Sequence, residues 1–273
     1  MKIGIFEVNG RTILGELEGE TLYGLAWPDN NMRSLIRRGI TPSRTYERFP
    51  LASATIKAPL IPGKIIAIGK NYAEHAKETG GAVPDSPLMF AKLPSAIIGH
   101  RDTIAWRTSI TNQVDWECEL AVVIGKTAKN VSEADALKYV FGYTLANDVT
   151  ARDLQNSDSQ WTRAKGLDTF CPLGPVIVTK DAIPDPQNVG LRTMVNAELM
   201  QNGNTSDMVF GVAALIAYIS SQITLDPGDV ILTGTPSGVG SGMNPQRSLS
   251  DGDVVTVSAD AIGDLTNSCR VIA

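Results

Sequence analysis

The strongest constraint on the fold is a series of short, mostly apolar runs that are separated by glycine- and proline-rich turns. They are Lys64–Ile68, Glu119–Ile124, Phe141–Ala146, Asp229–Thr233 and Asp253–Val257. Runs of this length and β-branched content predict strands. The helix candidates are fewer: Met32–Arg38, Ser132–Val140 and Gly211–Ser221. Many strands and few helices together indicate a β-dominated α+β fold.

The N-terminal part of the chain predicts a small, separate β-rich unit. Lys2–Val8 and Arg11–Leu17 are strand candidates, and they flank Asn9-Gly10, a pair typical of two-residue hairpin turns. The segment Ala58–Gly63 contains two prolines and a glycine, which indicates a linker. We therefore expect a small N-terminal domain over residues 1–58 and a main domain over residues 59–273.

Composition excludes several classes of partner. Of the 273 residues, 43% are hydrophobic, so a full core can form, and the net charge of -5 with no Lys/Arg run argues against nucleic acid. No apolar stretch reaches the roughly 18 residues of a membrane span, and the start lacks the features of a signal peptide. Cys118, Cys171 and Cys269 form no CxxC pair. We expect a cytoplasmic protein with reduced thiols.

The segment Asp115–Gly125 carries two acidic residues next to an apolar run. If it is a strand, Glu117 and Glu119 point to the same face, and Cys118 and Leu120 point to the other. Two adjacent carboxylates repel each other unless a cation lies between them, and hard divalent ions prefer oxygen ligands. A Glu-x-Glu pair alone is equally compatible with a solvated strand face.

A third carboxylate follows the run Phe141–Ala146. Asp148 stands at the predicted end of this strand, where it could complete a set of metal ligands. Arg152 and Gln155 follow at a spacing of three residues, so a helical turn would place both on one face. They could hold a carboxylate or an oxo group of a substrate, although a strand-exit cap with polar surface residues would have the same pattern.

The segment Gly69–Glu78 contains a possible general base. His75 and Glu78 are spaced i, i+3, so on a helical turn the carboxylate could orient the imidazole to take a proton from water. His100 has no comparable neighbour and is interpreted as structural. Residues 71–87 contain glycine and proline and little apolar content, which predicts a mobile lid.

These segments resemble the fumarylacetoacetate hydrolase family, in its shorter bacterial branch. That branch includes acylpyruvases, 2-oxohept-3-ene-1,7-dioate-type isomerases and oxaloacetate decarboxylases. The similarity extends from about Pro62 to the C-terminus. Further matching blocks, in the same order, are Leu88–Ser95, Trp161–Gly166, Asp168–Phe170, Asn204–Met208 and Leu232–Gly240. The sequence departs from the family at Cys118, where smaller or aliphatic residues are commoner, and at Lys92–Pro94, which lacks a second proline.

The resemblance implies a role for each of ten side chains. The metal ligands are Glu117, Glu119 and Asp148, which would hold one Mg²⁺ or Mn²⁺ ion per chain. The catalytic residues are His75, Glu78 and Lys165, the first two on a lid that becomes helical when ligand binds. The substrate-binding residues are Lys92, Arg152, Gln155 and Thr235.

The resemblance also implies a fold, an assembly and a reaction. The fold would be a mixed β-roll core with few helices, and the assembly a homodimer without nucleic-acid or membrane partners. The reaction would be hydrolysis of a C–C bond in a small β-diketo, acylpyruvate-like carboxylate, through a metal-stabilised enolate. Isomerisation of the 5-carboxymethyl-2-hydroxymuconate type and decarboxylation of oxaloacetate are alternatives, because both pass through the same enolate. A catalytically inactive binding homologue is the third possibility.

Overall fold

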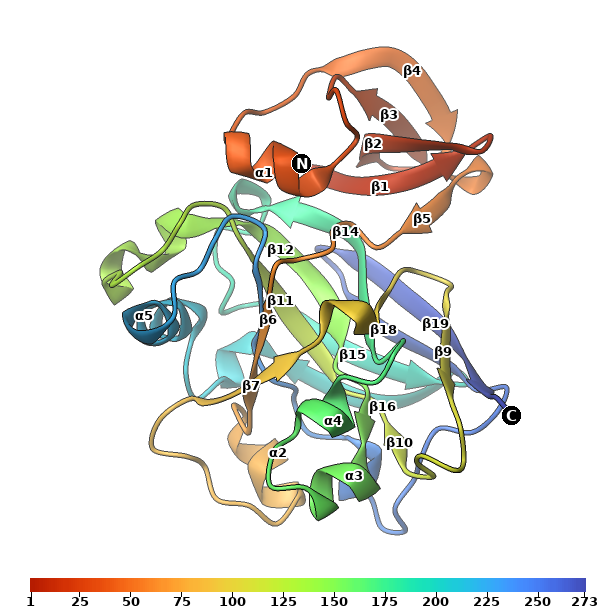
Figure 1. The fold of residues 1–273 in the computed structure, drawn as a ribbon, viewed down its shortest axis with the longest axis vertical. Coiled ribbons are helices and arrows are strands. Elements are labelled where there is room, and N and C mark those ends of the chain that lie inside the picture. Colours follow the sequence, from red (N-terminus) through yellow and green to blue (C-terminus); the bar gives the residue numbers. More distant parts are fainter.

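The computed structural model describes residues 1–273 and contains three β-sheets with few helices (Figure 1). The largest sheet has 12 strands, ten of them in the order β4-β3-β2-β1-β14-β12-β11-β17-β6-β7. Their bounds in this order are Arg44–Pro50, Thr21–Leu25, Arg11–Glu18, Lys2–Val8, Cys171–Thr179, Val140–Asn147, Cys118–Ile124, Val230–Leu232, Ile65–Gly69 and Leu88–Lys92. The remaining two strands, β5 (Thr55–Lys57) and β8 (Ile97–Ile98), pair with β1 and β14.

Two smaller sheets complete the β-structure. One has five strands in the order β16-β15-β18-β19-β9, with bounds Glu198–Asn204, Gly190–Val195, Val254–Ala259, Gly263–Val271 and Thr103–Trp106. The other pairs β10 (Val114–Asp115) with β13 (Thr150–Ala151). In the large sheet, β17 is antiparallel to β11 and parallel to β6. The mixed sheets confirm the predicted α+β class.

The helices are short. The α-helices are α1 (Met32–Arg38), α2 (Ala73–Glu78), α3 (Arg152–Ser157), α4 (Thr162–Lys165) and α5 (Val212–Gln222). The 3-10 helices are η1 (Leu51–Ser53), η2 (Pro94–Ala96), η3 (Glu133–Tyr139), η4 (Lys180–Ala182), η5 (Thr205–Asp207) and η6 (Gly240–Gly242). None of the helices has the length and apolar character that crossing a membrane requires.

The N-terminal strands and α1 gather at one end of the molecule (Figure 1). The predicted hairpin is present, and its turn residues Asn9 and Gly10 have φ values of 50° and 74°, a conformation that favours this residue pair. Strand β1 joins the large sheet through pairing with β14, at Lys2 with Val178 and Ile3 with Ile177. The boundary between residues 58 and 59 remains a prediction.

Local signals account for two of the three predicted helices. Helix α1 has the predicted bounds, because Asn31 caps its N-terminus by accepting from Ser34 N–H and Gly39 ends it with a φ of 61°. Helix α5 matches the predicted apolar pattern. The prediction for Ser132–Val140 is corrected to a 3-10 helix, because the Ser132 hydroxyl donates to the Asp135 carboxylate and does not cap the backbone.

Strand β11 runs through the middle of the core. Cys118, Leu120 and Val122 belong to one buried apolar cluster, whereas Ala121 and Val123 belong to another on the opposite face. A strand covered on both faces reads as a nearly continuous apolar run. Any carboxylate on this strand is therefore forced into a buried environment.

Candidate active site

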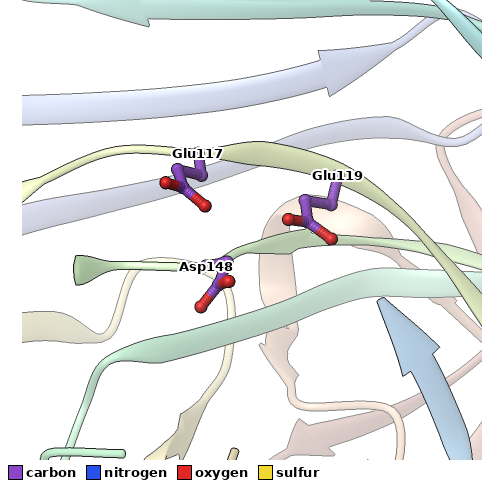
Figure 2. Close-up of side chains that lie close together, drawn as sticks. All are labelled: Glu117, Glu119 and Asp148. Atoms are coloured by element: carbon purple, nitrogen blue, oxygen red, sulfur yellow. The ribbon is translucent and has the colours of Figure 1, made fainter. Parts of the chain in front are cut away.

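Three carboxylates meet where β11 begins and β12 ends (Figure 2). Glu117 directly precedes β11, Glu119 is its second residue, and Asp148 directly follows β12. The antiparallel pairing of Cys118 with Asn147 brings these strand ends together. One oxygen from each carboxylate can be chosen so that all three lie within 4.8 Å of one another, and all three residues are buried. The spatial grouping predicted from strand alternation and from the strand-end aspartate is therefore present.

Buried cations surround two of the three carboxylates. Lys165 Nζ lies 2.7 Å from both Glu117 Oε2 and Asp148 Oδ2. Lys92 Nζ lies 2.6 Å from Asp148 Oδ1, and Arg152 lies 2.6 Å from Glu117 Oε1. Glu119 contacts no cation, and its Oε2 accepts a hydrogen bond from Gly234 N–H at 2.7 Å.

This asymmetry separates the acidities of the two glutamates. Burial raises the pKa of Glu117, but the charges of Lys165 and Arg152 outweigh it and bring that pKa to about 2. Burial raises the pKa of Glu119 well above its usual value, and the charges of Asp148 and Glu117 raise it further. The cluster therefore lacks positive charge at Glu119.

The donor set fits a hard divalent cation. It offers oxygen ligands alone, at mutual distances that one ion can span, and it opens towards a polar cavity where water or substrate can supply the remaining ligands. A cation beside Glu119 would also remove the repulsion that raises the pKa of this carboxyl group. The cluster contains no soft ligand, because its three members are all carboxylates. Burial raises the pKa of the Cys118 and Cys171 thiols to about 12.

The predicted His–Glu pair is formed on α2. His75 Nδ1 lies 2.9 Å from Glu78 Oε1, and Glu78 Oε2 accepts from Gly238 N–H at 2.9 Å. The carboxylate thus occupies Nδ1 and leaves Nε2 as the free ring nitrogen. His75 is buried and lines the same cavity as Glu117 and Glu119.

The cavity has a volume of about 250 Å³ and mostly polar walls. It is lined by Ile68, Gly69, Lys70, His75, Thr79, Phe90, Glu117, Glu119, Arg152, Gln155, Asn156, Trp161, Lys165, Thr235, Ser241 and Gln246. Of the four residues predicted to bind substrate, Arg152, Gln155 and Thr235 lie in this wall. Arg152 NH1 donates to Gln155 Oε1 at 2.9 Å, as their shared position on α3 predicts.

The position of Lys92 corrects the fourth of these predictions. Its side chain is fully buried, and it is not among the residues that line the cavity. Lys92 Nζ donates to Asp148 Oδ1 and to the main-chain carbonyls of Val149 and Lys165. Lys92 therefore holds Asp148 and the main chain at Val149 and Lys165 in place and is not part of the cavity surface.

The predicted lid is shorter than residues 71–87. Asn71 is buried, and its Nδ2 donates to the carbonyls of Phe210 and Thr233 at 3.0 and 2.8 Å while its Oδ1 accepts from Phe210 N–H at 2.9 Å. Tyr72 is also buried and forms a bridge to Met208. None of residues 77–86 is buried. The first two residues therefore anchor α2, and only the later part is a candidate lid.

Asp115 is a site residue that the sequence did not single out. Its Oδ1 accepts from the N–H groups of Trp116 and Gly240 at 2.8 and 2.7 Å. Its Oδ2 accepts from Ser241 N–H at 3.0 Å and from Arg152 Nε at 2.8 Å. Asp115 thus connects Arg152 to the main chain of η6 and fixes its position. Its place two residues before Glu117 was the available signal, but only the fold shows which groups it holds.

Gln201 is a second such residue, and it supports Thr235. Gln201 is buried on β16, and its Nε2 donates to Thr235 Oγ1 at 2.8 Å while its Oε1 accepts from Cys118 N–H at 2.9 Å. His100, interpreted as structural, accepts from Thr266 N–H at 3.2 Å and does not line the cavity.

Comparison with known proteins finds a family match, similar sequences and similar solved structures. Residues 64–270 match the family described as Fumarylacetoacetate (FAA) hydrolase C-terminal. The oxaloacetate tautomerase YisK of Bacillus subtilis is 46% identical over 223 residues, which are 80% of this chain and 74% of that protein. A solved fumarylacetoacetate hydrolase from Exiguobacterium antarcticum has a TM-score of 0.89 and 41% identity, with 100% of both chains covered. A 5-carboxymethyl-2-hydroxymuconate delta-isomerase from Mycobacterium smegmatis has a TM-score of 0.84 and 39% identity, also with 100% of both chains covered.

The fold and the acidic triad, of which Glu117 and Glu119 line a polar cavity, define the class as an α+β enzyme. The family match spans every residue that lines this cavity, including His75, Glu117, Glu119 and Thr235, and it also includes Asp148. The chain belongs to the fumarylacetoacetate hydrolase family, which confirms the predicted resemblance.

Proposed function

We propose that this enzyme interconverts the keto and enol forms of a small 2-oxo carboxylate with the help of one Mg²⁺ or Mn²⁺ ion. The observation that carries the proposal is the juxtaposition of two groups across one cavity. Glu117 and Glu119 of the triad line the cavity, with an oxygen of Asp148 within 4.8 Å of an oxygen of each, and His75, oriented by Glu78, lines it as well.

The ion would be held by the triad and would polarise the 2-oxo group, which lowers the cost of forming an enolate. His75 Nε2 would take a proton from the carbon next to the oxo group, and the protonated imidazole would return it to oxygen or to carbon. Glu78 stabilises the imidazolium. Lys165 adds positive charge near the developing oxyanion, an effect on the order of 3 kcal/mol per donor in other enzymes.

The relatives support tautomerisation. One similar protein is named oxaloacetate tautomerase and another delta-isomerase, and both names describe the movement of a proton next to a carbonyl group. Such a reaction needs a base and stabilisation of the enolate but no water molecule as a reactant, and a small polar cavity that holds both groups suits it.

Hydrolysis of a C–C bond is a second candidate, and the His75–Glu78 pair favours it. The same imidazole could take a proton from water, and the hydroxide would attack the distal carbonyl of an acylpyruvate. The C–C bond would then break, and the enolate of pyruvate would leave. Decarboxylation of oxaloacetate also gives this enolate and needs no base.

A substrate panel tests these proposals. The enzyme with Mg²⁺ or Mn²⁺ is assayed for loss of the enol absorbance of oxaloacetate, for acylpyruvate cleavage and for oxaloacetate decarboxylation. We expect tautomerisation to be the fastest reaction and to stop in chelator. Faster cleavage of an acylpyruvate would instead support the hydrolase, and tautomerisation that continues in chelator would contradict the role of the ion.

The assembly and cellular location extend this proposal. By analogy with the family, we expect a homodimer in the cytoplasm that acts on a small carboxylate and binds neither membrane nor nucleic acid. Sedimentation of a stable monomer at micromolar concentration would contradict the dimer.

A further inference from the structure

Lys70 differs from the other lysine and arginine side chains of the cavity wall. Arg152 contacts Asp115 and Glu117, and Lys165 contacts Glu117 and Asp148. Lys70 lines the same cavity, and its ammonium forms neither an ion pair nor a hydrogen bond with another residue. Its charge is therefore available to a ligand.

The backbone and the lid both accommodate the Lys70 side chain. Lys70 follows β6 with a φ of 55°, a left-handed conformation that glycine or asparagine would adopt at lower cost. A Cβ atom on Gly81 would lie 2.5 Å from Lys70 Nζ and 2.9 Å from its Cε, so the lysine fills the space that this glycine leaves. The end of the side chain is thus held between the cavity and the candidate lid.

The lysine and arginine side chains around the triad already have anionic partners within the protein. Lys92, Arg152 and Lys165 each contact Glu117 or Asp148. Lys70 has no such partner, so a second carboxylate on the ligand could supply one.

We propose that Lys70 is a specificity-determining residue that binds the distal carboxylate of the substrate. The substrates would then be short 2-oxo dicarboxylates, with the 2-oxo acid end at the triad and the far carboxylate at Lys70. This inference rests on the proposed function for the position of the 2-oxo acid end. An ammonium donates strong, charge-assisted hydrogen bonds to a carboxylate, and it tolerates several ligand orientations.

Binding of two stable hydroxy acids to the full chain loaded with Mg²⁺ tests the proposal independently of catalysis. Malate and 2-hydroxybutyrate have the same chelating end and differ in having a carboxylate or a methyl group at the other end. We expect calorimetry to show that malate binds the unchanged protein about 10-fold or more tightly than 2-hydroxybutyrate. Lys70→Met should remove this preference by weakening malate alone, and Lys70→Arg should keep part of it.

Lys77→Met is the matched control, because Lys77 is an exposed lysine on the neighbouring α2 and does not line the cavity. It should change neither affinity. Equal affinity of the two acids for the unchanged protein, failure of malate to bind, or a Lys70→Met variant that keeps the preference would each overturn the proposal. If tautomerisation is absent while the malate preference depends on Lys70, the proposed function fails and the specificity residue stands.

Discussion

The floor and the roof of the cavity are built differently. The floor consists of the triad at the ends of β11 and β12, inside the large sheet, where buried cations and backbone groups fix the carboxylates. The roof consists of α2 and residues 77–86, which are anchored at Asn71 and at Glu78 but otherwise have no buried residue after Ala76. In Figure 1, α2 lies at the end of the molecule opposite the N-terminal strands.

This difference separates two tasks. A metal site needs ligands at fixed positions, which a strand buried on both faces can provide. Substrate entry needs a segment that opens at low free-energy cost, and such segments have few buried contacts. Because His75 belongs to the roof, opening would remove the base from the cavity without disturbing the triad.

Removing a ligand from the floor should have the largest effect. Glu119→Ala should abolish Mg²⁺-dependent activity, a loss of about 10⁴-fold or more, because the ion supplies several kcal/mol of enolate stabilisation. The fold should remain, since Glu119 makes a single hydrogen bond and no ion pair. Activity is measured with and without chelator, and circular dichroism provides the control. Full activity of this variant in chelator would show that the triad does not act through a metal.

Removing the base from the roof should have a smaller effect that depends on the reaction. His75→Ala should lower kcat by roughly 10²–10⁴ for tautomerisation or for acylpyruvate cleavage, the usual contribution of general acid–base catalysis. The loss should be much smaller for decarboxylation of oxaloacetate, which needs no proton transfer by the dyad. Kinetics with saturating Mg²⁺ on these substrates separate the cases. Unchanged kcat on all of them would exclude His75 from the mechanism.

The sequence predicted those arrangements in the floor and in the roof that depend on local rules, including the His75–Glu78 pair. Strand alternation places Glu117 and Glu119 together, and the end of a strand places Asp148 beside them. The i, i+3 spacing of Arg152 with Gln155 is likewise a local property of a helical turn. All of these arrangements are present in the structure.

The features that the sequence did not predict depend on contacts between distant segments. Asn71 is anchored by residues that lie 139 and 162 positions away, so the composition of its own segment could not indicate burial. Lys92 forms a fully buried ion pair with Asp148, 56 positions away, so its own segment could not indicate its burial. The hydrogen bond from Gly240 N–H of η6 to Asp115 Oδ1 joins residues 125 positions apart.

Loss of the Asn71 contacts, which anchor the roof to the rest of the protein, should lower the stability of the fold. Asn71→Ala removes three hydrogen bonds to the main chain of Phe210 and Thr233, and we expect it to lower the free energy of unfolding by about 2–4 kcal/mol. Denaturant unfolding measures this change. The matched control is Asn112→Ala, which removes one exposed contact to the Thr108 carbonyl and should cost under about 1 kcal/mol. Equal losses for the two variants would refute the anchoring role of Asn71.

The smallest expected effect is a change in amide hydrogen exchange of the roof when a ligand binds to the unchanged protein. Amide hydrogens of residues 77–86 should exchange rapidly in the free protein and more slowly with Mg²⁺ and oxalate, whereas those of β11 should be protected in both states. Hydrogen-exchange mass spectrometry resolves the two segments. Identical exchange of residues 77–86 in the two states would mean that this segment does not close over a ligand.

Binding of Mn²⁺ tests the central claim, that the triad holds one divalent ion, most directly. Titration followed by the electron paramagnetic resonance signal of free Mn²⁺ should show one tightly bound ion per chain. Glu119→Gln, which keeps the shape of the side chain, should lose this site, and Glu133→Gln on exposed η3 should retain it. Undiminished binding of one Mn²⁺ ion by the Glu119→Gln variant, or no tight binding by the unchanged protein, would contradict the account.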